Sequence, residues 1–207
     1  MKTTIKTTML CVLCLCLSYA STSGEHDPFS EIADRLAAAD CLRVDFLHIV
    51  ESAVFHDVDS MPGAAALDQQ GRYRIELPND HFLCDGSTSY SYSIPNNQIV
   101  IEDVSGEHAA AGHELLFLTN LKERYSIRPI VDGKSYKLRQ VTTHQSALPD
   151  SMTAYLSGDG GQLDRFEYFD INEDRNSLII RSLTTERPCP DSLFTPSWPD
   201  SVDRVKL

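Results

Sequence analysis

Apolar positions recur every three or four residues near the start of the chain, and every second residue over most of its remaining length. Asp27 and Pro28 supply the N-cap and the first-turn proline of a helix, and Asp40 is expected to end it. Its apolar side is formed by residues at helical spacing, namely Phe29, Ile32, Ala33, Leu36 and Ala37. The pattern therefore predicts an amphipathic helix ahead of the first strand.

Short segments of period two, separated by turn residues such as Asp85-Gly86 and Asp132-Gly133, predict β-strands after this helix. Met61-Pro62-Gly63 is expected to interrupt them. The segments between 72 and 101 follow one another so closely that they predict an antiparallel meander. The predicted strands are 42–55, 72–77, 81–84, 90–94, 99–101, 124–129, 135–142, 152–156, 163–171 and 177–183, with 202–205 as a candidate edge strand.

The period changes once more at 109–122, a segment that is apolar on nearly all sides. It predicts a second helix that is either enclosed or lies on an apolar surface which it must sometimes leave. About eleven antiparallel strands predict a mainly β (α+β) fold, a strongly curved sheet or incomplete barrel. The two helices are expected to fill its concave side.

The first residues are typical of a secretory signal peptide. Lys2 and Lys6 precede an apolar run, and Ala20 ends a small-residue cleavage site. The apolar run is shorter than the roughly 20 residues of a spanning helix. We therefore expect residues 1–20 to be a signal peptide and 21–207 a single domain, with an uncleaved anchor as the alternative.

Charge and cysteine count change once this leader is removed. Two of the 18 basic residues leave with it, so the formal charge moves from −12 to −14, which argues against nucleic acid as a partner. Three of the six cysteines also leave. Cys41, Cys84 and Cys189 remain, and they allow one disulfide with one free thiol, or three free thiols.

The candidate catalytic and metal motifs are incomplete. Gly112-His113-Glu114 begins like a zinc-protease helix, but Phe117 stands where the second histidine belongs. The segment 170–176 begins like a calcium loop, but Arg175 stands where that loop needs glycine. We therefore expect no enzyme activity, no metal and no cofactor, and a plain hairpin turn at 170–176.

Aliphatic and aromatic stripes on the predicted strands are the remaining signal. They form either an ordinary packed sheet face or the wall of an apolar cavity that accepts acyl chains. The candidate wall residues are Val44, Phe46, Tyr73, Ile75, Leu77, Tyr90, Tyr92, Ile99, Ile101, Phe166 and Tyr168. The candidate lid residues, which would cover this wall, are Phe29, Ile32, Leu36, Leu115, Leu116 and Leu118.

Several segments, in order, resemble the LolA-like family of periplasmic outer-membrane lipoprotein carriers. They are the strand Tyr73-Arg74-Ile75-Glu76, the hairpin Asp85-Gly86-Ser87-Thr88 with Tyr90 and Tyr92, the strand Asn97-Gln98-Ile99-Val100, and the ending from Leu193 to Val202. The likeness runs from about residue 28 to the end. In that family a tryptophan often stands at the place of Tyr90, and a lid-holding arginine at the place of Gln69.

The resemblance implies an open β half-barrel with a helical lid, acting as a monomeric carrier in the periplasm. Its cargo would be the acyl chains of lipoproteins, or another lipid. An inner-membrane machine would release cargo to it, and an outer-membrane receptor would accept it. The alternative function is a structural or interaction module of the envelope whose concave face is packed solid.

Overall fold

The computed structural model describes residues 27–104, 114–141, 148–158 and 161–207. The predicted signal peptide, His113, and the first part of the predicted helix 109–122 lie outside these residues. The described chain begins with α1 (Pro28–Ala37), whose N-terminus is capped as the sequence predicts. The Asp27 carboxylate accepts a hydrogen bond from the Phe29 amide at 3.2 Å.

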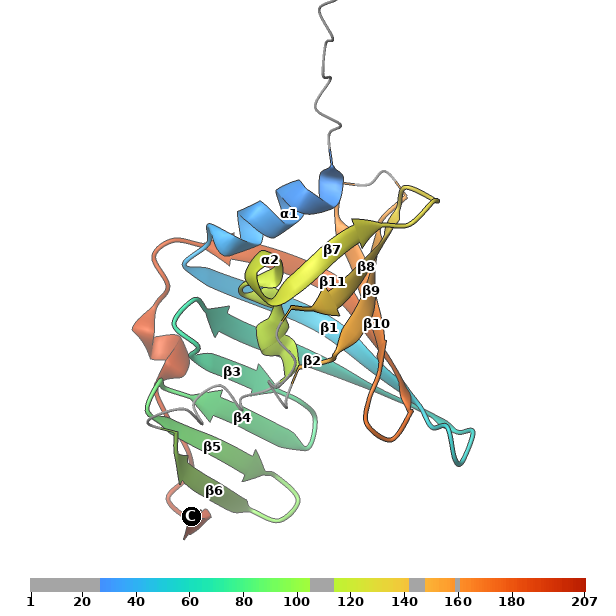
Figure 1. The fold of residues 1–207 in the computed structure, drawn as a ribbon. Helices are drawn as coiled ribbons and strands as arrows, with labels where there is room; N and C mark the ends of the chain where they lie inside the picture. Colours follow the sequence, from blue (N-terminus) through green and yellow to red (C-terminus); the bar gives the residue numbers. More distant parts are fainter. Residues whose placement is uncertain (1–26, 105–113, 142–147, 159–160) are drawn as a thin grey trace, which may run out of the picture.

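One sheet of twelve strands forms the body of the molecule (Figure 1). Its order is β12-β6-β5-β4-β3-β2-β1-β11-β10-β9-β8-β7, and every neighbouring pair is antiparallel except β12 and β6. The strands are β1 (Cys41–Glu51), β2 (Val58–Asp68), β3 (Tyr73–Glu76), β4 (Asp80–Cys84), β5 (Thr88–Ser93), β6 (Gln98–Asp103), β7 (Tyr125–Pro129), β8 (Ser135–Gln140), β9 (Ser151–Leu156), β10 (Leu163–Phe169), β11 (Arg175–Glu186) and β12 (Asp203–Lys206).

The mainly β fold with an open sheet is confirmed. Within the described residues the two edge strands, β7 and β12, do not pair with each other, so the sheet stays unclosed. Figure 1 shows its curvature, with α1 and the segment around α2 on the same side. The hairpin turn predicted at 170–176 is also present, between β10 and β11.

The interruption predicted at Met61-Pro62-Gly63 is wrong, because β2 continues through it. Pro62 pairs with Leu47 of β1, while β3 ends at Glu76, opposite Ala64. Among the described strands, only β1 borders this part of β2. Proline lacks an amide hydrogen, and a position bordered on one side tolerates that loss.

The helix predicted at 109–122 is also wrong in form over its described part. The chain makes a short 3₁₀ helix, η2 (Glu114–Leu118), and then a single turn of α-helix, α2 (Leu121–Arg124). The Thr119 hydroxyl donates a hydrogen bond to the Leu116 carbonyl at 2.9 Å, and Asn120 stands at the N-cap position of α2 with a non-helical backbone. Threonine and asparagine are both poor residues for a helix interior, so the apolar run does not continue as one helix.

Strand register divides the sheet into two faces. We call the face that contacts α1 and η2 the inner face, and the opposite one the outer face. On β1, Val44 and Phe46 lie on the inner face, opposite Ala65 and Gly63 of β2. Most buried apolar side chains of the described residues belong to one cluster between this face and the two helical segments.

The C-terminal tail, residues 187–202, lies on the outer face, where it contacts residues of β1 to β5. A disulfide joins Cys41, the first residue of β1, to Cys189 in the tail, and leaves Cys84 as a buried free thiol. The Arg74 guanidinium donates hydrogen bonds to the carbonyls of Leu193 and Thr195, at 2.6 and 2.8 Å. The tail is therefore a fixed part of the fold.

Candidate functional site

Seven of the eleven candidate wall residues lie together on the inner face. From β1 the wall continues across β2 to β3 and the residue after it, and on the other side to β10. These residues are Val44, Phe46, Tyr73, Ile75, Leu77, Phe166 and Tyr168, all buried except the half-buried Leu77. Burial raises the pKa of the Tyr73 hydroxyl to about 12, so this group stays neutral at physiological pH.

The other four candidates, Tyr90, Tyr92, Ile99 and Ile101, lie on the outer face. Tyr92 pairs with His81, and the inner-face residue Phe82 pairs instead with Ser91. Trp198 of the tail packs against the Tyr92 ring at a centroid distance of 5.1 Å. The inner face of β5 therefore presents serines, and the apolar wall ends near β4.

Gly63 also belongs to the wall, although it is not among the candidate residues because glycine adds no side chain to an apolar stripe. The Phe46 ring and Leu77 pack directly over its backbone. A Cβ atom added at Gly63 would lie 2.4 Å from Cζ of Phe46 and 2.8 Å from Cδ2 of Leu77. Glycine at this position thus allows the side chains of Phe46 and Leu77 to lie directly against the backbone of β2.

Helix α1 covers one part of the wall with the side chains that the sequence assigns to a lid. Phe29, Ile32 and Leu36 are buried, and the Phe29 ring stacks on Tyr136 of β8 at 4.8 Å. The Gln69 side-chain amide, at the end of β2, donates a hydrogen bond to the Leu36 carbonyl at 3.0 Å. Gln69, which stands where the resemblance places a lid-holding arginine, is therefore hydrogen-bonded to α1.

The η2 segment covers another part of the wall. Leu115, Leu116 and Leu118 are buried, as is Phe117, which the candidate lid set omits. The Phe117 ring meets Phe166 of the wall edge-on, at 4.7 Å. The sequence gives no signal that separates Phe117 from the leucines beside it, because the segment is apolar on nearly all sides.

An ion pair connects the two covering segments. The Lys122 ammonium of α2 lies 2.5 Å from a carboxylate oxygen of Asp34 on α1. Both side chains are partly exposed, so the pair is open to screening by salt. It bridges α1 and α2 at the surface.

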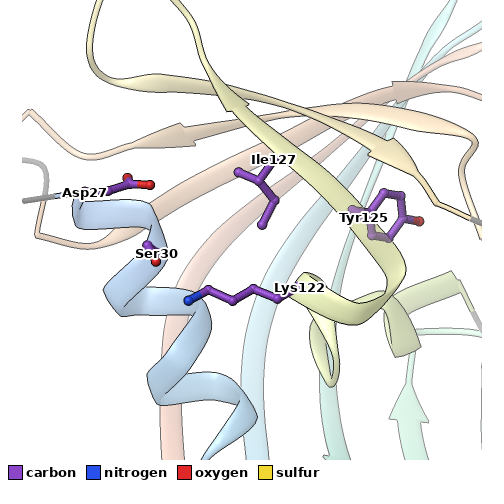
Figure 2. Close-up of a pocket in the computed structure, with 5 residues that line it drawn as sticks. All are labelled: Asp27, Ser30, Lys122, Tyr125 and Ile127. Carbon is purple, nitrogen blue, oxygen red and sulfur yellow. The ribbon is translucent and has the colours of Figure 1, made fainter. Parts of the chain in front are cut away.

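A groove opens between α1 and the edge strand β7 (Figure 2). It has a volume of about 270 Å³ and is lined by Asp27, Ser30, Lys122, Tyr125 and Ile127. Tyr125 and Ile127 lie on the inner face of β7, and the Tyr125 hydroxyl donates to the Pro149 carbonyl at 2.9 Å. Burial raises the pKa of Tyr125. The groove thus has a polar mouth over an apolar floor.

The described residues offer no other recognised chemistry at this face. They contain no group of three or more His, Cys, Asp or Glu side chains placed to hold a metal ion. Nor does a described helix combine the length and apolar content that crossing a membrane requires. What the site offers is an apolar wall, two covering segments and a groove beside one of them.

No family model matches the sequence. No curated protein matches it either. Solved structures do resemble it. An uncharacterized conserved protein from Thermus thermophilus is 13% identical, with a TM-score of 0.49, over 86% of this chain and 99% of that one.

A LolA superfamily protein from Nitrosomonas europaea is 11% identical, with a TM-score of 0.44, over 80% of this chain and 95% of that one. An outer membrane lipoprotein-sorting protein domain from Vibrio parahaemolyticus is 10% identical, with a TM-score of 0.42, over 79% and 94%. At these identities and TM-scores the likeness assigns no ligand and no function. Proteins of the family that the sequence resembles are thus among the solved structures similar to this chain.

Proposed function

We propose that the protein is a periplasmic carrier that binds the acyl chains of lipoproteins, or of another lipid, on the inner face of its sheet. The observation that carries the proposal is the cover over the wall. Side chains from two separate segments, α1 and η2, bury an apolar face of a sheet that no further strand closes within the described residues. Such a cover hides a large apolar patch when the carrier is empty, and so limits aggregation.

Binding of an acyl chain requires the cover to move. The groove beside α1, at about 270 Å³, is smaller than the roughly 300–1,000 Å³ of ligand pockets, and a second hollow at the β1–β2 part of the wall, at about 370 Å³, is near the lower end of that range. Displacing α1 would expose the wall beneath Phe29 and Leu36, and displacing η2 would expose Phe166. The hydrogen bond from Gln69 and the Asp34–Lys122 ion pair are polar contacts that opening would break.

The energetics explain why a carrier is useful and why it needs partners. Each buried methylene contributes about 0.8 kcal/mol, so a chain of about 16 carbons is held out of water by about 12 kcal/mol. The carrier shields the chain in transit, but it can unload only to a site of higher affinity. We therefore include in the proposal an inner-membrane machine that loads the carrier and an outer-membrane receptor that empties it.

The test is lipid retention by a variant of η2. Leu116→Glu places a carboxylate against the wall, so we expect the variant to retain less acylated cargo while its sheet stays folded. Native mass spectrometry of protein purified without detergent measures the acyl adducts, and circular dichroism reports the sheet. Val131→Glu, at a fully exposed position, is the matched control.

Two results would contradict the proposal. Equal adducts on Leu116→Glu and the control would remove η2 from the binding site. A clean apo mass for the unmodified protein, with no binding of a hydrophobic dye, would instead favour an envelope module with a solid core.

A further inference from the structure

Two neighbouring hairpins end in exposed apolar side chains. The turn between β1 and β2 presents Val54, Phe55 and Val58, which are 61–79% exposed. The turn between β10 and β11 presents Phe169, 67% exposed, and Ile171, 98% exposed. We call these five side chains the tip patch. A cluster of this kind is costly in water and is typical of an interaction site.

The two turns are fixed side by side by polar contacts. The Ala53 amide at the first turn donates a hydrogen bond to the Asp174 carboxylate of the second, at 2.8 Å. Arg175 of β11 lies 3.5 Å from Glu51 of β1, and these two residues are also register partners. The tip patch is therefore a single surface carried by a continuous sheet.

Acidic side chains surround this patch. Asp57 and Asp59 flank Val58, and Glu173 follows Ile171; all three are exposed. Glu51, Asp170 and Asp174 lie in or directly beside the same two turns, and the one lysine or arginine there is Arg175. Arg175 is already paired with Glu51 and Glu167. In the strand register this Glu51–Arg175 pair lies between two of the apolar side chains, Val58 and Phe169, so apolar and charged side chains alternate across the patch. With the acidic rim, the potential of the surface is negative overall.

The tip patch lies at the far end of the strands from α1 (Figure 1). Strand β1 begins at Cys41, just after α1, and runs for eleven residues to Glu51. At about 3.3 Å per residue this places the patch roughly 35 Å away from the lid helix. Binding at the tip patch is therefore a separate event from movement of α1, and the inference does not rest on the ligand of the inner face.

We propose that the tip patch docks a partner protein whose surface carries apolar side chains interspersed with lysine or arginine. Charge complementarity favours this occupant. A bilayer with anionic lipids would repel the acidic rim, and a second copy of the chain would bring the same charge. Five side chains bury a small area, so the contact is a transient one with a salt-dependent association rate.

Binding of two model peptides by the full chain without its leader tests this proposal. The peptides are amphipathic, of equal length, built from leucine with lysine or leucine with glutamate. We expect the Leu/Lys peptide to bind and to weaken as salt rises. Val54→Ser, Phe55→Ser and Ile171→Ser together should lower its affinity at least about tenfold, the effect of losing one well-buried apolar side chain.

Matched controls separate the patch from the overall charge of the chain. Ile130→Ser with Val131→Ser removes exposed apolar groups from the turn between β7 and β8. Asp57→Asn with Asp59→Asn should weaken Leu/Lys binding, whereas Glu123→Gln with Asp200→Asn, which removes the same charge elsewhere, should not. Equal effects in patch and control variants would overturn the proposal.

Vesicles and crosslinking decide between occupants. One experiment measures binding of the chain to phosphatidylcholine and phosphatidylglycerol vesicles. If the chain bound to either and the patch variant did not, the occupant would be a membrane, which would overturn the proposal. In cells, a photoreactive benzophenone side chain at position 55, but not at 131, should crosslink to a peptide that carries lysine or arginine beside apolar residues. Crosslinking to lipid alone, or to no protein, would overturn it as well.

Discussion

Gln69 connects two elements that must separate if the inner face is to open. Its amide holds the last turn of α1 through the Leu36 carbonyl. We expect Gln69→Ala to lower the stability of α1 by about 1 kcal/mol, the net contribution of one hydrogen bond. Amide hydrogen exchange in α1 should become faster while exchange in the sheet is unchanged.

The neighbouring residue supplies the control for this experiment. Gln70 is exposed at the same turn, so Gln70→Ala should leave exchange in α1 as it is. Equal exchange rates in the two variants would show that the Gln69 contact does not hold the helix.

Glu167 gives the fold a dependence on pH. Burial alone would raise the pKa of this carboxyl, but its ion pairs with Arg165 and Arg175, at 2.9 and 3.2 Å, bring it below the ordinary value of 4.5. The unfolded chain therefore takes up the proton first as pH falls. The stabilisation is complete above pH about 5 and is lost as pH falls through the lower folded-state pKa.

Urea unfolding between pH 2 and 7 measures this effect. The free energy of unfolding should fall less steeply at acidic pH in Glu167→Gln than in the unmodified protein. Glu123→Gln, an exposed position on α2, is the comparison. If the two variants followed the same pH dependence, the ion pairs of Glu167 would not be the cause.

Residue identity in the wall could be predicted only in part. Alternation along one strand is visible in the sequence, so Val44 with Phe46 and Tyr73 with Ile75 are assigned together correctly to one face. The sequence does not show which stripe of one strand continues a stripe of the next, because the turn length sets that register. Tyr92 illustrates this, since its apolar stripe lies under the tail.

At the scale of elements, α1 could be predicted because its signals are local. The Asp27 cap, the proline that follows it and the 3.6-residue period all act within ten residues. The form of 114–124 could not be predicted from its apolar run. In that segment, packing against the wall and the hydrogen bond from the Thr119 hydroxyl favour a 3₁₀ turn over a continuous α-helix.

The attachment of α1 can be weakened without altering the sheet. Phe29→Ala removes a fully buried ring that stacks on Tyr136, and such truncations cost about 3–5 kcal/mol. We expect the loss to appear as local opening of α1 and as increased binding of a hydrophobic dye to the inner face. Phe55→Ala, at an exposed position, is the control. Dye binding that stays equal in both variants would argue against α1 as a movable cover.

At the scale of the molecule, the disulfide connects positions 148 residues apart. In the chain-entropy model, a crosslink over so long a loop stabilises the fold by about 5 kcal/mol. Replacing Cys41 and Cys189 together with serine should lower the free energy of unfolding by about that amount, as measured in urea.

Thiol counting checks the pairing itself. Without residues 1–20, which hold the other three cysteines, the unreduced protein should yield one thiol per chain. That thiol, Cys84, should react only after unfolding because it is buried. Detection of Cys189 as the free thiol would contradict the pairing and, with it, the fixed position of the tail.

The position of β1 in the middle of the sheet determines the order in which the molecule can assemble. Strands β1 to β6 on one side, and β7 to β11 on the other, follow one another along the chain and pair through local turns. The contact between β1 and β11 joins residues such as Glu51 and Arg175, 124 positions apart. Closing so long a loop is slow, so the two halves are expected to form before they meet. Until then each half exposes the apolar surface that the finished protein hides, and the growing chain is most prone to aggregate in that interval.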